Sequence, residues 1–480
     1  MPYDKMWIGG EWMVAESGKT FDVINPATEE VIAQLPLGGE PEVNKAVDAA
    51  QKAFPEWAAK SQAERSQVML QIAEAFKPYI EELGKIDTMD HGTPAGMAVG
   101  MMMDVPKDFE YAAWVSLSFM DSVIPGRTTS FNYLQREPVG VCAVITPWNA
   151  PLGVVITKIS AALATGNTCI VKPPSIDSMT TLKFAEILDS MGLPAGLVNV
   201  ITGPGGEVGN ALAAHPGVDN ITFTGSLETG AAIMAAASPT VKRVCLELGG
   251  KNPFIVMEDG DVDKAVMKGV MTVCANTGQI CASPGRFHVH EKVYDEFVEK
   301  YVERMKTVKF GDPNDKSTFM GPVVSAEHRD KIESYYKIGV EEGANLVLGG
   351  KRPEEPGKGY YVAPTVFTDV TPDMRLAKEE VFGPLAVIMK FTSEDDPAAL
   401  ANDNIYGLCA SVWCANIPEA MRIANRIRAG AVWINDHMIK GQDLPWGGFR
   451  RSGYGKENGL MGLEEYTQKK WISFSLDGPK

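Results

Sequence analysis

Apolar side chains in the first quarter of the chain recur at intervals of three and four residues, which is the spacing of one helix face. The pattern predicts helices over 41–59 and 64–83, within a region that is helical from 41 to 120. Three consecutive methionines at 101–103 lie in this region, and we interpret them as adaptable core packing rather than as ligands. This part of the chain therefore predicts a helical layer.

From Val141 onward the pattern changes to short apolar runs rich in β-branched residues, each followed by a helical stretch. The runs predict buried strands at 142–147, 167–173, 197–202, 220–225 and 242–248. Helices are expected between them at 151–165, 178–191, 206–214 and 227–238. Strands that alternate with helices form a mostly parallel, doubly wound sheet, which binds ligands at the carboxyl ends of its strands.

A second α/β region begins after Gly250, and we expect it to be a separate domain. Its strands are predicted at 254–257, 286–290, 386–391 and 410–415, and its helices include 262–275 and 293–308. Two extended, alternating segments, 130–140 and 469–476, lie outside both α/β patterns. They are expected to pair with each other or to extend a sheet in another subunit.

The composition narrows the class of protein only slightly. A chain of 480 residues exceeds one compact core, and its 45% hydrophobic and 22% charged residues are typical of soluble globular proteins. The formal net charge of −16, without a basic block, argues against nucleic acid as a partner. No stretch is long and apolar enough to span a bilayer, and the N-terminus lacks the pattern of a secretory signal.

The seven cysteines are odd in number and scattered, which favours a reducing cytoplasm over a disulfide framework. Six of them lie within apolar strand-like or helical runs. Cys281 differs, because it lies in the polar, glycine-containing segment 276–286, where a thiolate would be exposed and activated. Cys281 is therefore the candidate nucleophile of this sequence.

Two polar residues end predicted strands beside this candidate. Glu247 follows apolar residues, so it is expected to be a partly buried general base with a raised pKa, or a carboxylate paired with Lys251 or Lys242. Asn149 ends the first strand, where it is either a turn former or an amide that donates to a developing oxyanion.

Small residues and one lysine follow other strands of the same predicted sheet. The turn containing Gly205 and Gly209 opens a helix, as a pyrophosphate-binding turn does, but it lacks the GxGxxG pattern and is equally an ordinary turn. Ser226, after Gly225, is a good helix N-cap and is also compatible with a bound pyrophosphate. Lys172 is either a solvated strand end or a ligand of adenosine ribose hydroxyls or a 2′-phosphate.

The order of these motifs along the chain resembles the aldehyde dehydrogenase superfamily. The resemblance is carried by PWN, TGNTCIVKPP, FTGS, LELGGKNP, NTGQIC, EEVFGP, PWGGFRRSGYGKENG and EEYTQKK. It implies an α/β fold with a Rossmann-like parallel-sheet cofactor domain, a second α/β catalytic domain and a small β oligomerisation element. We assign 1–118 and 141–249 to the first, 250–445 to the second, and 119–140 with 446–480 to the third.

The resemblance also implies a role for each motif. Cys281 matches the nucleophile, Glu247 the general base, and Asn149 with the Cys281 backbone N–H the oxyanion hole. Glu380 is expected at the nicotinamide ribose of NAD or NADP. The candidate cofactor-binding residues are Trp148, Lys172, Ser175, Gly205, Gly209, Phe223, Gly225, Ser226, Leu248, Glu380 and Phe382.

Three departures bear on specificity. Ser175 stands where NAD-preferring relatives often carry a glutamate, so NADP is plausible. Thr157 stands where succinate-semialdehyde enzymes typically carry an arginine, which argues against a dicarboxylic substrate. Ala150 stands where many relatives carry an aromatic residue, so the expected substrate pocket is roomy and apolar, which favours a bulky or aromatic aldehyde. Its residues are Ala150, Val154, Thr157, Ile280, Ala282 and Trp446.

Other functions stay open on the sequence alone. A CoA-acylating dehydrogenase is disfavoured by Glu247, and a cofactor-free cysteine hydrolase by the lack of a histidine in a matching motif. An inactive binding relative is disfavoured by the intact Cys281, Glu247 and Asn149. We expect a cytoplasmic homodimer or homotetramer that acts on a small-molecule aldehyde, without a metal site.

Overall fold

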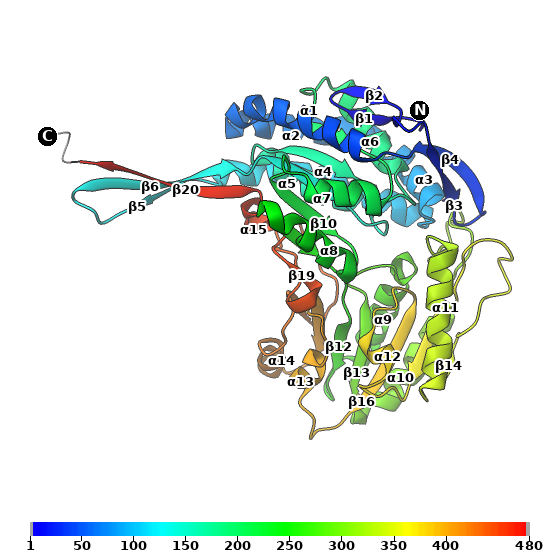
Figure 1. Cartoon of the computed structure of the whole chain (residues 1–480). Coiled ribbons are helices and arrows are strands. Elements are labelled where there is room, and N and C mark those ends of the chain that lie inside the picture. The colour runs from blue at the N-terminus through cyan, green and yellow to red at the C-terminus, as the bar shows by residue number, and fades with distance from the viewer. Residues whose placement is uncertain (1–2, 477–480) are drawn as a thin grey trace.

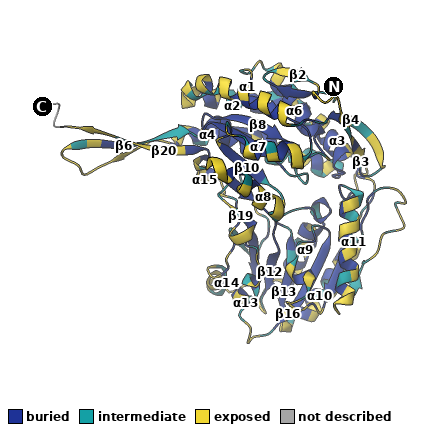
Figure 2. Cartoon of the chain, viewed as in Figure 1, coloured by how far each residue is buried: buried dark blue, intermediate teal, exposed yellow. Residues whose placement is uncertain are grey.

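The computed structural model describes residues 3–476 and has three parts. Two α/β blocks lie one above the other in Figure 1, and a narrow β-ribbon projects sideways from the upper block. In Figure 2 the strands of both blocks are largely buried, whereas much of the ribbon is exposed. The division into two α/β parts and a small β element confirms the predicted fold class.

The first sheet, within residues 3–476, has the strand order β19-β11-β10-β7-β8-β9-β1-β2. Its five central strands are parallel and match the predicted runs. They are β7 (Val141–Ile145), β8 (Thr168–Lys172), β9 (Val198–Val200), β10 (Asn220–Thr224) and β11 (Arg243–Glu247). The edge strands β1 (Met6–Ile8), β2 (Glu11–Met13) and β19 (Gly453–Tyr454) are antiparallel to their neighbours.

The order of these strands creates a point where the winding direction of the chain reverses. The chain passes outward from β7 to β8 and β9 through α5 (Pro151–Ala164) and α6 (Met179–Ser190). It then returns across the sheet to β10, on the other side of β7, and continues through α8 (Leu227–Ala237) to β11. Residues that follow β7 and β10 therefore meet at the position where doubly wound sheets bind ligands.

One helix differs from the predicted pattern. The helix expected over 206–214 is instead a π-helical turn at Gly205–Gly209 followed by α7 (Asn210–Ala214). Glycine is a poor helix former, and three of the five residues in the turn are glycines. The regular helix therefore starts only after the last of them.

A helical layer precedes the first sheet, as predicted. It consists of α1 (Glu40–Ala59), α2 (Gln62–Phe76), α3 (Ile80–Asp90) and α4 (Ala95–Ser118). Ser61 caps α2, because its hydroxyl accepts from the Glu64 N–H while the Glu64 carboxylate accepts from the Ser61 N–H. Helix α4 packs against α2, α3 and α5, and it supplies one wall of the cavity described below.

The second sheet, in the part of the chain that is described, has the order β14-β15-β16-β13-β12-β17-β18, and all of its pairs except β14 with β15 are parallel. Phe254 lies at its centre, packed against Phe287 and Trp413 at ring-centroid distances of 4.9 and 5.3 Å. The strands are β12 (Asn252–Val256), β13 (Pro284–His290), β14 (Asn345–Leu348), β15 (Thr365–Thr368), β16 (Leu385–Phe391), β17 (Cys409–Trp413) and β18 (Ala431–Ile434).

Helices cover this second sheet. Those expected at 262–275 and 293–308 are α9 (Val262–Cys274) and α10 (Glu291–Lys306). The others are α11 (Ala326–Glu341), α12 (Arg375–Lys378), α13 (Pro397–Asn402) and α14 (Ile417–Ala424). Among residues 3–476, no helix combines the length and apolar character needed to cross a membrane.

The projecting ribbon is built from β5 (Ser122–Ile124), β6 (Ser130–Pro138) and β20 (Thr467–Ser475). Strand β20 pairs antiparallel with β6 along its whole length, so the two extended segments do pair with each other. The boundary expected at residue 446 is wrong, because β19 joins the first sheet and α15 (Gly459–Glu464) packs on α4 and α5. Only β20 of the C-terminal segment belongs to the ribbon, since the residues before it complete the first domain.

Candidate active site

A cavity of about 670 Å³ lies between α4, α5 and the loops that join the two sheets. Asn149, Glu247 and Cys281 all line it, so the three predicted catalytic residues share one space. They come from the end of β7, the end of β11 and the loop before β13. Residues separated by up to 132 positions (281 minus 149) therefore converge because both sheets point toward the same interface.

The loop that carries Cys281 is held in a strained backbone conformation. Asn276 and Thr277 have positive φ angles of 49° and 56°, and Gly278 follows with 74°. A Cβ on Gly278 would lie 2.2 Å from the backbone carbon of Gly383. Gln279 is buried, and its side chain donates to Asn276 O at 3.0 Å and accepts from Val324 N–H at 2.9 Å. Such strain persists only where the surroundings hold it, so the position of Cys281 is tightly determined.

The Cys281 thiol is enclosed by the cavity wall rather than freely exposed. Burial raises the pKa of the Cys281 thiol to about 12, and the carboxylates of Glu247 and Glu380 act in the same direction. Lys440 and the Ala282 N–H, which donates to the sulfur, oppose this rise. Cys281 is nevertheless partly exposed, whereas the other six cysteines are buried, as its polar loop predicted. The raised pKa does not support the expected activation of the thiolate.

Glu247 ends β11 and is only 4% exposed. Burial raises its pKa well above the usual value, and the Glu457 carboxylate adds to this, whereas Lys158 lowers it. Within residues 3–476 its Oε1 atom has no hydrogen-bond partner. The predicted alternative of an ion pair does not occur, because Lys242 donates to His215 O and no ion pair joins Lys251 to Glu247. Glu247 therefore lines the cavity as a buried carboxyl with a raised pKa and one oxygen that has no partner among the described residues.

Asn149 is tied to the cysteine loop in both directions. Its Nδ2 donates to Gln279 O at 2.8 Å, and its backbone carbonyl accepts from Asn276 Nδ2 at 2.9 Å. An amide nitrogen carries two hydrogens, so one N–H of Asn149 is left for the cavity that it lines. This arrangement suits an oxyanion donor better than the turn-forming role.

The candidate cofactor residues on the first sheet lie along its carboxyl edge. Lys172 ends β8, and burial lowers its pKa to about 8 while Asp177 opposes the change. Ser175 donates to Gly203 O at 2.9 Å. Ser226 caps α8 by accepting from Thr229 N–H at 3.2 Å. Of the two roles expected for Ser226, the structure thus shows the helix N-cap. The N-terminus of α8 nevertheless faces the reversal point of the sheet.

Among the candidate cofactor-binding residues, several are glycines or apolar residues, and close packing explains some of these residue types. A Cβ on Gly225 would lie 2.4 Å from the ring of Phe223, and one on Gly230 would lie 2.7 Å from Leu248. Around Gly205 and Gly209 an added Cβ would meet no atom within 4 Å. Gly225 and Gly230 are therefore required by packing in the protein interior, whereas Gly205 and Gly209 border open space.

Glu380 and Phe382 approach from the second domain. Glu380 accepts from Gly250 N–H at 2.9 Å, and burial raises its pKa to about 7. Phe382 has a positive φ of 63° and packs edge-on against Trp148 at 5.3 Å. His328 packs against both of these rings, at centroid distances of 5.0 Å from Trp148 and 6.0 Å from Phe382. Trp148 is therefore part of an aromatic cluster that joins the two domains.

Most residues of the expected substrate pocket line the cavity. They are Ala150, Val154, Thr157, Ile280 and Trp446. Ala282 is an error in that list, because it is fully buried and does not line the cavity. Its carbonyl accepts from His437 Nε2 at 2.8 Å, which turns the residue into the protein interior.

Helix α4 contributes a wall of the cavity that the sequence pattern did not predict. Met97, Met101, Asp104, Val105 and Asp108 all line the cavity, and their spacing follows one helix face. Thr157 Oγ1 donates to Asp108 Oδ2 at 3.3 Å, and burial raises the pKa of Asp108 to about 7. The spacing of these five residues could have indicated a shared helix face, but nothing in the sequence indicates that this face meets the cavity.

Comparison with known proteins gives concordant matches over the whole chain. The model of the aldehyde dehydrogenase family matches residues 12–472. Betaine aldehyde dehydrogenase of Bacillus subtilis (strain 168) is 42% identical over 475 residues, covering 97% of this chain and 96% of that protein. A hydroxyisobutyraldehyde dehydrogenase of Mycolicibacterium austroafricanum is 41% identical over 474 residues, covering 98% and 94%.

Solved structures agree with these matches. A crystal structure of a point mutant of Staphylococcus aureus betaine aldehyde dehydrogenase, in complex with NAD+ and with a chemically modified cysteine, has a TM-score of 0.97 and 37% identity. It covers 100% of this chain and 99% of its own. A second structure of that enzyme with NAD+, with its cysteine unmodified, has a TM-score of 0.97 at 38% identity and covers 100% and 95%.

The raised thiol pKa predicts how Cys281 reacts in the ligand-free protein. Because thiolate is the reacting form, its modification by iodoacetamide should accelerate about tenfold per pH unit between about pH 7 and 10, without a plateau. Mass spectrometry of the peptide that contains Cys281 measures the rate, and Cys281→Ser is the control. A plateau near pH 8 would contradict the enclosed, neutral thiol.

Proposed function

This chain belongs to the aldehyde dehydrogenase family, and we propose that it oxidises an aldehyde to a carboxylic acid through a thioester on Cys281. One observation carries the proposal: Cys281, Glu247 and Asn149 line a single cavity at the domain interface. A nucleophile, a base and an oxyanion donor are the groups that acyl transfer requires, and they are otherwise far apart in the chain.

The residues along the carboxyl edge of the first sheet fit NAD or NADP. The N-terminus of α8 suits a pyrophosphate, and Lys172 at the end of β8 suits ribose hydroxyls. Glu380, on the opposite side, is suited to the nicotinamide ribose. Staphylococcus aureus relatives bind NAD+, which supports the same choice here. When bound, the nicotinamide ring accepts the hydride that the aldehyde loses.

The cofactor preference depends on Ser175. A glutamate at this position would accept from ribose hydroxyls and repel a 2′-phosphate, whereas Ser175 is neutral and donates to Gly203 O. Asp177, two residues further on, is fully buried, so its carboxyl is not exposed to a 2′-phosphate as a glutamate at position 175 would be. We therefore propose that the enzyme accepts NADP as well as NAD.

The groups of the chain itself account for the first half of the reaction. The Cys281 thiol gives its proton to water, and the thiolate attacks the aldehyde carbon while negative charge develops on the aldehyde oxygen. The N–H groups of Asn149 and of the Cys281 backbone stabilise that charge, since they are already oriented by the cysteine loop. Loss of the hydride then leaves a thioester on Cys281.

Glu247 accounts for the second half. In its carboxylate form Glu247 is a stronger base than an exposed glutamate, because burial raises its pKa. It takes a proton from water, and the resulting hydroxide hydrolyses the thioester. Transfer of the acyl group to CoA would need no such base. The buried, unpaired carboxyl therefore favours hydrolysis over CoA acylation.

The cavity lining favours a bulky or aromatic aldehyde. Trp433 and Trp446 lie nearly parallel with their rings 6.4 Å apart, and the α4 methionines adapt to irregular apolar shapes. Thr157 cannot neutralise a second carboxylate, because a hydroxyl carries no charge, and its hydrogen is donated to Asp108. The two curated relatives are named for different aldehydes, so overall identity does not select the substrate.

We also propose that the β-ribbon joins subunits into a homodimer or homotetramer. Val123, Phe131, Trp471 and Phe474 expose large apolar side chains on it. Exposed apolar side chains on a projecting sheet with free edges are typical of an interface.

The half-reactions predict the behaviour of Glu247→Gln. With NAD or NADP and a panel of aldehydes, the wild type should form reduced cofactor continuously. The variant should give a burst of about one reduced cofactor per subunit and a turnover about 10²- to 10⁴-fold lower, since only the base is lost. Absorbance at early times measures both phases.

Two comparisons sharpen this test. Glu465→Gln removes a neighbouring carboxyl that accepts from Lys456 N–H, and it should retain turnover. Full turnover in Glu247→Gln removes that residue from its proposed role, and turnover that depends on added CoA supports the acylating alternative.

The Asp108 carboxyl predicts a pH dependence of substrate binding. With a pKa near 7 it is neutral at pH 6 and charged at pH 8, so an apolar aldehyde meets a charge in the cavity as the pH rises. The KM for an aromatic aldehyde should rise up to about tenfold between pH 6 and 8. Asp108→Asn should abolish this rise, whereas Asp104→Asn should retain it; equal profiles of wild type and Asp108→Asn would refute the assignment.

The ribbon predicts the subunit state. Val123 is 60% exposed, and Val123→Lys should lower the mass measured by sedimentation velocity, because a charge would be buried in the interface. Val340→Lys, at a residue 54% exposed on α11, is the matched control and should leave the mass unchanged. Unaltered mass in Val123→Lys would place the interface elsewhere.

A further inference from the structure

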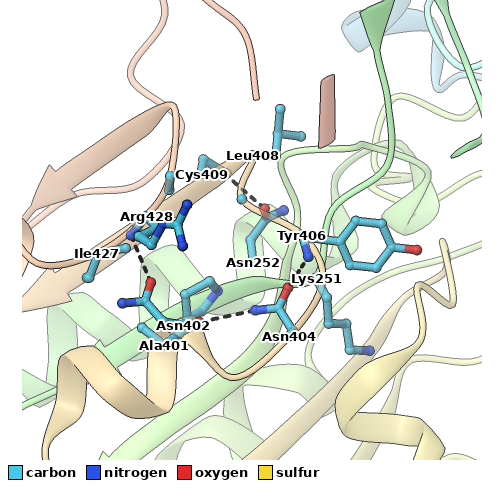
Figure 3. A pocket seen from close by; sticks show the side chains of 13 residues that line it. Lys251, Asn252, Ala401, Asn402, Asn404, Tyr406, Leu408, Cys409, Ile427 and Arg428 are labelled. Atoms are coloured by element: carbon cyan, nitrogen blue, oxygen red, sulfur yellow. Dashed lines mark hydrogen bonds between the residues drawn. The ribbon is translucent and has the colours of Figure 1, made fainter. Parts of the chain in front are cut away.

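Asn252 is a buried amide that contacts the cysteine loop without lining the catalytic cavity. It is 1% exposed and begins β12. Its Nδ2 donates to Cys281 O at 2.7 Å and to Ser283 O at 2.8 Å. Its Oδ1 accepts from Cys409 N–H at 3.2 Å, a contact drawn in Figure 3 beside a crevice of about 10 Å³. One side chain thus joins β12, β17 and the cysteine loop.

The two hydrogen bonds from Asn252 act on the backbone next to the nucleophile. The peptide unit between Cys281 and Ala282 is planar, so fixing the direction of its carbonyl also fixes the direction of its N–H. That N–H belongs to Ala282 and donates to the Cys281 sulfur. A hydrogen bond to the carbonyl also polarises the peptide, which strengthens the N–H as a donor.

The next carbonyl along the loop is fixed independently. Ala282 O accepts from His437 Nε2 at 2.8 Å, and His437 Nδ1 lies 3.1 Å from Ser411 Oγ. Cys409 Sγ also donates to Ala282 O, at 3.6 Å, so three side chains restrain the backbone from Cys281 to Ser283. Among the side chains of residues 3–476, the one that hydrogen-bonds to the carbonyl of the Cys281–Ala282 peptide is that of Asn252.

We propose that Asn252 is a positioning residue that aims the Ala282 N–H at the Cys281 sulfur and thereby stabilises the thiolate during attack. The charged groups around the sulfur are Lys440, Glu247 and Glu380, and two of these three disfavour the thiolate. An oriented N–H dipole therefore complements Lys440 without adding a further charge. The proposal rests on the proposed role of Cys281 as the nucleophile.

Asn252→Leu tests the proposal, because leucine has a similar volume and no donor. The matched control is Asn199→Leu: Asn199 is also buried, donates to Cys169 O and Gly196 O, and accepts from Gly9 N–H in the first sheet. Both variants lose the same kinds of hydrogen bond, so they should lose comparable stability. Only the Asn252 change should act on Cys281.

The measurement is the rate at which iodoacetamide modifies Cys281 at about pH 8, with the folded fraction matched by circular dichroism. Loss of one thiolate-stabilising hydrogen bond corresponds to a thiol pKa higher by about 0.5–1, so Asn252→Leu should react about three- to tenfold more slowly. Asn199→Leu should react at the wild-type rate. If Asn252→Leu does not fold, Asn252→Ser replaces it in the test. Serine keeps one hydroxyl donor, so this variant should be alkylated at a rate between those of the wild type and the expected leucine variant.

Equal modification rates in the Asn252 variants and in Asn199→Leu would overturn the proposal. Because alkylation needs neither aldehyde nor cofactor, this result is independent of turnover. Slower alkylation without aldehyde oxidation in the wild type would support the role of Asn252 while refuting the proposed function. The kcat with aldehyde should fall in parallel with the alkylation rate, since both depend on the same sulfur.

Discussion

The passage of the chain from one parallel sheet to the other within residues 247–252 is the constraint on which the rest of the site depends. Glu247 is the last residue of β11 and Asn252 the first of β12. Between them, a Cβ on Gly249 would lie 2.2 Å from Glu380 Oε2, and one on Gly250 would lie 3.1 Å from Cys281 O. Two glycines therefore allow both sheets, the cysteine loop and Glu380 to meet at one point.

Burial at this junction sets the electrostatics of the site. It raises the pKa values of Cys281, Glu247 and Glu380, so the groups around the cavity tend toward their neutral forms. A thiol whose pKa is raised reacts more slowly with alkylating agents, because less of it is thiolate. Reactivity then depends on fixed dipoles, such as the N–H groups of Ala282 and Asn149, more than on permanent charges.

The pattern of apolar residues along the chain predicted the structure correctly where neighbouring residues of one segment are buried together. All five central strands of the first sheet were predicted, because buried parallel strands are continuous β-branched runs. Cys281, Glu247 and Asn149 followed from their positions at strand ends or in a polar loop. The helical segment 206–214 was predicted to within one residue, but its spacing did not show that the glycine-rich first turn is π-helical. Ala282 was misplaced because its neighbour's exposure says nothing about its own orientation.

The sequence by itself determined the family, the order of the elements and the candidate chemical groups, since these depend on residue type and spacing along the chain. Only the tertiary structure decided that α4 supplies Asp108 to the cavity, that β19 completes the first sheet, and that Asn252 holds the nucleophile's peptide. These contacts join residues far apart in the chain. Their pairing and their pKa shifts depend on burial and direction in space, which a linear pattern does not contain.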